Sequence, residues 1–173
     1  MKKTIIFLFV SLIVISLTAC SASSKSKEEI EQNALNTIVE DYEVQFNNIN
    51  DESNNVLSAF NNALDGYYTK RSSNSTFKSI LSEKILASSQ FIKETEEKEV
   101  DTTVLSFHQQ VVVYLNQQHQ LLLDAVEMAN ENEVDKGTLR ESYLNLKQQQ
   151  VDMTNSWIEL KQSILSGEEM KKR

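Results

Sequence analysis

The sequence of 173 residues contains no proline, three glycines and one cysteine, and its formal net charge is -8 at pH 7. Such an acidic chain is a poor match for nucleic acid or anionic lipid headgroups, and a single cysteine excludes an internal disulfide. Because proline and glycine are the main interrupters of helices, this composition predicts an almost entirely helical chain with few breaks.

The N-terminal segment has the features of an export signal. Lys2 and Lys3 form a short basic region, and the stretch 5–17 that follows is apolar except for two serines. The alternative is an uncleaved membrane span, for which residues 4–19 fall slightly short of the about 20 apolar residues required. The motif at the end of this segment consists of Leu17, Thr18, Ala19 and Cys20.

This motif resembles a bacterial lipobox, with the only cysteine of the chain at the modified position. The resemblance implies transfer of a diacylglyceryl group to the Cys20 thiol and cleavage between Ala19 and Cys20. We expect two or more acyl chains to anchor Cys20 on the extracytoplasmic face of the cell membrane, because a single chain holds a protein only marginally. Ser21 is not the Asp associated with inner-membrane retention, so an outer-membrane location stays open if the cell is Gram-negative.

Cleavage would define the organisation of the mature chain. Removing the signal peptide, residues 1–19, from the 173-residue sequence leaves 154 residues, enough for one domain. It also removes two lysines, so that the net charge falls from -8 to -10. Residues 20–27, rich in Ser and Lys, are then expected to form the lipidated cysteine and a flexible tether.

Residues 28–68 have the spacing of one long amphipathic helix. Apolar residues recur at alternating steps of three and four, and the same phase continues across the Asn- and Asp-rich stretch 47–55. In that stretch Asp51 or Ser53 could cap a new helix. The uninterrupted phase favours a continuous helix.

Three further helices follow, with connections expected near 65–75, 94–101 and 130–137. We expect Ser75 and Asp101 to cap the second and third helices, and Thr138 with Glu141 to form a capping box for the fourth. Gly167 is placed to end the fourth helix in a left-handed conformation, which leaves a charged C-terminal tail, 168–173. The sequence therefore predicts an all-α, elongated, antiparallel up-and-down bundle over residues 28–167, with three to four helices and a long first helix.

The sequence offers no catalytic constellation. His108 and His119, the only histidines, lie on one predicted helix about 16 Å apart along its axis, so one metal ion cannot bind both. Neither has the carboxylate or histidine neighbours of helical metal sites, and the acidic connections lack the spacing of a calcium loop. No serine stands in a Gly-x-Ser-x-Gly turn. We therefore expect no enzymatic activity, no metal and no cofactor.

Two functional hypotheses are consistent with these features. The first is a non-catalytic accessory or scaffold lipoprotein that contacts a protein or the cell wall, and whose helix seams could pair two copies of the chain. Its architecture resembles that of small helical lipoproteins of Gram-positive envelopes. The candidate contact patch at the end of its first helix consists of Tyr68, Lys70 and Arg71. The second hypothesis is a bundle that senses a small ligand between its helices, in a cavity with converging polar groups near His108, Tyr114 and Gln150.

Overall fold

The computed structural model describes residues 3–167, with the side chains of Lys27 and of residues 29–167. All regular secondary structure in this part of the chain is helical. The four helices are α1 (Lys3–Tyr68), α2 (Asn74–Glu96), α3 (Thr102–Glu131) and α4 (Lys136–Ser166). The chain divides into two units, Met1–Glu40 and Asp41–Arg173, and the second unit contains the packed bundle.

Helix α1 is continuous through residues 47–55, as the apolar phase predicted. Its start differs from the expected position near residue 28, because the helix also includes residues 20–27, where a flexible tether was expected. No proline or glycine interrupts the sequence before Gly66, so nothing local ends a helix there. The tether of a cleaved chain stays a prediction. Buried α1 side chains of the second unit that follow the predicted phase are Tyr42, Phe46, Ile49, Ser53, Val56, Leu57, Phe60 and Leu64, and Ala63 beside this phase is also buried.

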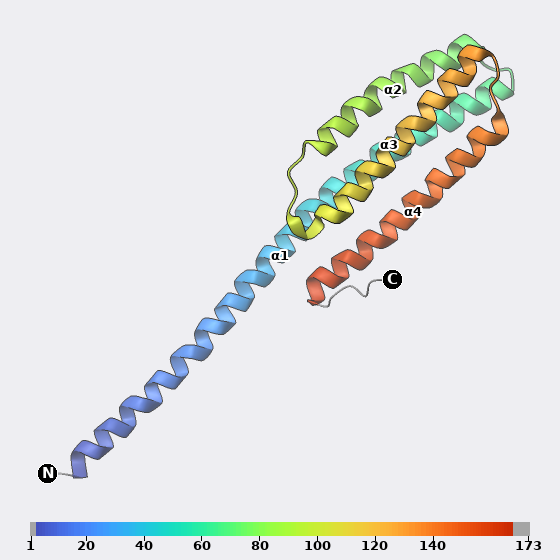
Figure 1. Ribbon diagram of the computed structural model, residues 1–173. Coiled ribbons are helices and arrows are strands. Elements are labelled where there is room, and N and C mark those ends of the chain that lie inside the picture. The colour runs from blue at the N-terminus through green and yellow to red at the C-terminus, as the bar shows by residue number, and fades with distance from the viewer. Residues whose placement is uncertain (1–2, 168–173) are drawn as a thin grey trace. The chain divides into compact units, whose positions relative to one another are not determined.

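From Asp41 onward, successive helices run in opposite directions, as Figure 1 shows. The rings of Tyr67 and Phe77 join α1 to α2, with centroids 5.3 Å apart. An ion pair of 2.6 Å between Lys161 Nζ and Glu43 Oε2 joins α4 to α1. Short connections between amphipathic helices favour antiparallel neighbours, and the predicted all-helical bundle is confirmed.

An aromatic cluster joins α1, α3 and α4 in the core. The ring of Trp157 lies 5.0 Å from that of Tyr42 and 5.5 Å from that of Phe107, between centroids. Phe46 packs edge-on against Phe107 at 5.1 Å. These tilted and edge-on arrangements are the ones that aromatic pairs prefer. The apolar face of α4 that contains Trp157 therefore packs against other helices of the same chain.

Two of the predicted helix starts are wrong by a few residues. The N-cap of α2 is Ser73, whose Oγ accepts from the Thr76 backbone N–H at 3.1 Å, so Ser75 lies inside the helix. The N-cap of α4 is Asp135, whose Oδ1 accepts from Gly137 N–H at 2.8 Å, so Thr138 also lies inside. In both cases a suitable capping side chain stands earlier in the sequence, and the helix starts at the earlier one.

Two other predicted helix ends are confirmed. Asp101 caps α3, and its Oδ1 accepts from the Thr103 backbone N–H at 2.8 Å. Gly167 follows α4 in the left-handed conformation, with φ of 69°. The other glycines lie in end turns of helices, Gly66 in α1 and Gly137 in α4, and not in the connections expected there.

Candidate functional site

The lipobox residues lie in helix α1, and their side chains fall outside the side chains that the structure describes. The predicted tail, 168–173, likewise lies outside the described residues. Where side chains are described, at Lys27 and residues 29–167, no helix combines the length and apolar character that a membrane crossing requires. Lipid attachment at Cys20 and cleavage after Ala19 therefore stay predictions.

Tyr68, from the predicted contact patch, has contacts within the bundle. Its hydroxyl donates to the backbone oxygen of Val134 at 2.5 Å, and Lys136 Nζ lies 4.8 Å from its ring centroid. Tyr68 thus joins the C-terminal end of α1 to the connection between α3 and α4. Its polar group is engaged inside the chain.

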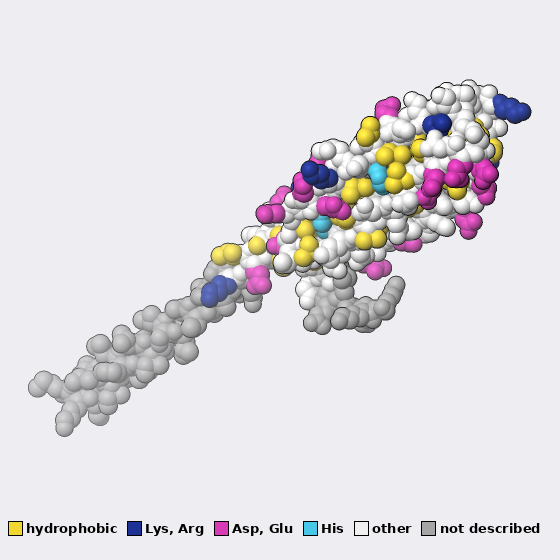
Figure 2. Space-filling model, turned by 45° about the horizontal axis from the view of Figure 1, so that its top comes forward, with side chains coloured by type: hydrophobic (Ala, Val, Ile, Leu, Met, Phe, Trp, Pro, Cys, Tyr) yellow, Lys and Arg dark blue, Asp and Glu magenta, His cyan; other side chains and the backbone are white. Residues whose placement is uncertain are grey.

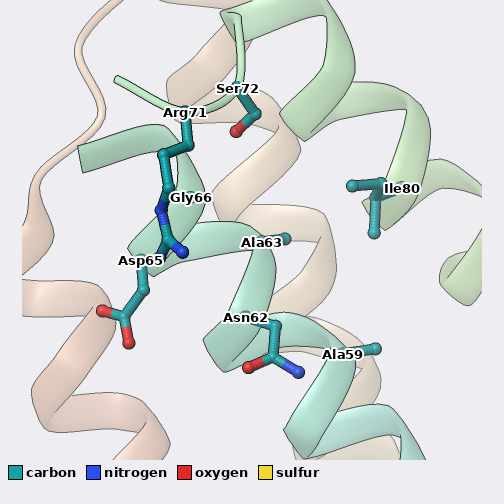
Figure 3. Close-up of a pocket in the computed structure, with 8 residues that line it drawn as sticks. All are labelled: Ala59, Asn62, Ala63, Asp65, Gly66, Arg71, Ser72 and Ile80. Atoms are coloured by element: carbon teal, nitrogen blue, oxygen red, sulfur yellow. The ribbon is translucent and has the colours of Figure 1, made fainter. Parts of the chain in front are cut away.

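Lys70 and Arg71 are exposed in the connection between α1 and α2. Lys70 adopts the left-handed region, with φ of 58°, and Arg71 Nε donates to Thr69 Oγ1 at 2.8 Å. In Figure 3, Arg71 extends over the last turns of α1 beside Gly66, at an open surface pocket of about 490 Å³. A Cβ on Gly66 would lie 3.1 Å from Ser72 Oγ, so the glycine permits this close approach. Lys70 and Arg71 are accessible to a partner, and their role stays a prediction.

A buried polar layer crosses the bundle at Ser53. Its Oγ lies 2.8 Å from Tyr114 Oη, and it accepts from Gln118 Nε2 at 3.1 Å and from Gln150 Nε2 at 3.4 Å. All four residues are at most 6% exposed. A hydroxyl has one hydrogen and two lone pairs, so Ser53 can satisfy all three neighbours at once. The layer therefore joins α1, α3 and α4 through one serine.

The remaining bonds of this layer are also made within the protein. Gln118 Nε2 donates to the Ser53 backbone oxygen at 3.0 Å, and Gln150 Nε2 donates to the Asn50 backbone oxygen at 3.4 Å. Lys147 Nζ donates to Gln150 Oε1 at 2.7 Å. Burial raises the pKa of Tyr114, and the hydrogen bond with Ser53 partly opposes this effect. The Tyr114 hydroxyl stays neutral near pH 7.

His108 forms a second buried contact between helices. Its Nε2 lies 3.0 Å from the backbone oxygen of Thr95, near the C-terminal end of α2. Because a carbonyl oxygen only accepts, Nε2 carries the hydrogen, and Nδ1 accepts from the Tyr42 hydroxyl at 3.2 Å. Burial lowers the pKa of His108, while its bond to Thr95 opposes that shift. The neutral imidazole thus holds α1, α2 and α3 together.

His119 lies farther along α3 and has a different partner. Its Nδ1 lies 2.7 Å from Ser88 Oγ on α2, and burial lowers the pKa of its ring. The two histidines therefore support separate contacts between α2 and α3. Within the described residues, no group of three or more histidine, cysteine or acidic side chains could hold a metal ion.

The residues proposed for ligand sensing do not converge on one cavity. Tyr114 and Gln150 meet at Ser53, whereas His108 bonds to Tyr42 and Thr95. His108 also borders an open surface pocket of about 640 Å³, but both of its ring nitrogens are engaged by protein groups. In the sequence, Ser53 falls in the apolar phase of α1, but the only role predicted for it was that of a possible helix cap. A polar residue in an apolar phase is the signal that could have indicated this layer.

Comparison with protein-family models, with curated proteins and with solved structures finds no match to the chain. The functional argument therefore depends on the residues of this chain and on the geometry described above.

Proposed function

We propose that this chain is an extracytoplasmic lipoprotein, anchored through lipid on Cys20, whose helical domain acts without catalysis through contacts with another protein or the cell envelope. The observation that carries the proposal is the lipobox, which follows a basic start and an apolar stretch at the N-terminus. The anchor would keep an acidic domain beside the membrane, because the net charge falls from -8 to -10 when the two lysines of the signal peptide are removed.

Two features of the bundle support a role through contacts. The buried polar groups at Ser53 and His108 are bonded to other protein groups, so they are engaged in holding helices together. The described surface carries acidic side chains with fewer basic ones, and hydrophobic side chains are exposed between them, as on the face in Figure 2. Such a surface suits a protein or wall partner better than a polyanion. A ligand-sensing role would require buried polar groups that are available to a ligand.

Replacing Cys20 tests the anchor and the contact role together. We expect Cys20→Ala to abolish acyl labelling and cleavage, because the thiol that accepts the diacylglyceryl group is absent. The wild-type chain should fractionate with membranes at the mass of the lipidated mature form, and crosslinking in intact cells should capture a partner that the variant captures less. Ser21→Ala keeps the cysteine and is the matched control.

Two results would contradict the proposal. If Cys20→Ala migrates like the wild type and stays equally membrane-bound, the lipoprotein assignment is wrong. If the lipidated wild-type chain captures neither a protein nor wall material, the contact role is wrong although the anchor is present.

A further inference from the structure

The outer face of α4 carries a second regular pattern, distinct from the seam that packs into the core. Leu144, Val151 and Ile158 are spaced by seven residues, and their exposed fractions are 55%, 52% and 47%. Leu165 continues the series and is half-buried. Solitary exposed hydrophobic residues are ordinary, but these form one line along a single helix.

Uncharged amide side chains alternate with this line. Gln148, Asn155 and Gln162 each follow a line residue by four positions, and all three are exposed. Together the two sets occupy the d and a positions of a heptad repeat over about 30 Å of helix. The buried residues of α4 occupy the opposite c and f positions and are Leu139, Leu146, Gln150, Met153 and Trp157. We call the outer a and d set, residues 144–165, the outer seam.

The charges beside the outer seam differ in sign between its two sides. The g side carries Lys147 and Lys161, and the e side carries Asp152 and Glu159. In a parallel pair of helices, a g residue faces the e residue five positions later on the partner, so Lys147 meets Asp152, the one oppositely charged pair of this seam. In an antiparallel pair, g faces g and e faces e, so like charges would meet.

Three of these charges, Lys147, Asp152 and Glu159, form no ion pair within the described part of the chain. Lys147 Nζ lies 2.9 Å from Asn54 Oδ1 and 2.7 Å from Gln150 Oε1, which are both amide oxygens. Asp152 Oδ1 accepts from Gln148 Nε2 at 2.9 Å. Lys161, by contrast, is already paired with Glu43. Lys147 and Asp152 are five residues apart, the separation that places them opposite each other in a parallel pair.

We propose that the outer seam binds a second copy of this chain, in a parallel and in-register pair of α4 helices. Leu144, Val151 and Ile158 pack against their own copies, and the polar residues at the a positions, Gln148, Asn155 and Gln162, lower the stability of the pair. Lys147 of each copy lies opposite Asp152 of the other. A twofold axis along the helices also sends both N-terminal ends in the same direction, which suits two lipid anchors in one membrane. Only this last point rests on the proposed function.

Single cysteines at two a positions test both the pairing and its direction. In the full chain with Cys20→Ala, the added cysteine is the only thiol, and a parallel in-register pair brings each a residue beside its own copy. We therefore expect Gln148→Cys and Asn155→Cys each to form disulfide-linked dimers under mild oxidation in detergent solution. Ser156→Cys is the matched control, because residue 156 is also exposed on α4 but lies away from the outer seam.

One further variant and the meaning of each outcome complete the test. Adding Val151→Glu should reduce the Asn155→Cys crosslink several-fold with unchanged helicity, because Val151 is 52% exposed and outside the core. Crosslinking at neither a position above the Ser156→Cys level overturns self-pairing. Crosslinking at only one of them overturns the parallel arrangement. In an antiparallel pair, a residue lies beside its own copy only where the twofold axis crosses the helices, so the two cysteine positions cannot both crosslink. Loss of the anchor would change membrane fractionation but not these crosslinks, so the two proposals fail separately.

Discussion

Ser53 is the residue on which the buried polar layer depends, and Ser53→Ala should destabilise the bundle by about 1–3 kcal/mol. The Tyr114 hydroxyl loses its partner at 2.8 Å and becomes a buried polar group without a hydrogen bond. Gln118 and Gln150 lose less, because each keeps a backbone acceptor, at 3.0 Å and 3.4 Å. The expected cost is therefore close to that of one unsatisfied buried hydroxyl.

Tyr114→Phe removes the other partner and should cost less, about 0.5–1.5 kcal/mol, because Ser53 keeps both amide donors. In the double variant neither hydroxyl is present, so the combined loss should be smaller than the sum of the single losses. A coupling of about 1 kcal/mol is expected for two side chains in direct contact.

Urea unfolding of the purified chain, followed by circular dichroism at the helical band, measures these differences. The variants are compared at an unchanged slope of the free energy of unfolding against urea concentration. Ser58→Ala is the matched control, because Ser58 is exposed on the same helix and reports the gain in helix propensity alone. If Ser53→Ala and Ser58→Ala have the same effect, or if the double variant is additive, the proposed role of Ser53 is refuted.

Two further predictions concern pH and a helix cap. Burial lowers the pKa of His108 in the folded state. Once the pH falls below about 6.5, the unfolded state therefore binds more protons than the folded state. The free energy of unfolding should decrease as the pH is lowered further, until the lowered pKa of the folded state is passed. His108→Gln should weaken this dependence in thermal unfolding from pH 8 to 5, and an unchanged pH profile would exclude His108 as its source. Asp135→Ala should cost about 0.5–2 kcal/mol through loss of the N-cap of α4, and Thr138→Ala clearly less. Equal losses in urea unfolding would favour the cap assigned from sequence.

The helical class and the continuity of α1 could be predicted because they depend on local properties of the sequence. The apolar phase through residues 47–55 is a pattern of neighbouring side chains, and a helix that keeps its phase needs no tertiary information to be recognised. The same holds for Asp101 and Gly167, whose capping roles follow from their own chemistry and position. Where two capping residues stand close together, as at Asp135 and Thr138, the sequence does not rank them.

The polar layer could not be predicted, because its bonds join residues far apart in the chain. Ser53 and Tyr114 are 61 residues apart, and Ser53 and Gln150 are 97 apart. Periodicity places each of these residues on the inner face of its own helix. Which polar groups bond to each other depends on how the helices are positioned relative to one another along their axes. His108 and Gln150 were placed between the helices only under the ligand-sensing hypothesis, and their partners were not predicted.

The sequence by itself determined the lipobox-like motif that ends at Cys20, the long first helix and the apolar periodicity of α4, since each is a pattern read along a continuous segment. Only the tertiary structure decided which face of α4 packs within the chain. The neighbouring helices cover Leu146, Met153 and Trp157, so their apolar surface is already buried within one chain. Leu144, Val151 and Ile158 stay exposed on the opposite face, because no other helix of the bundle covers them. The surface available for a second copy is thus determined by packing, which local periodicity does not record.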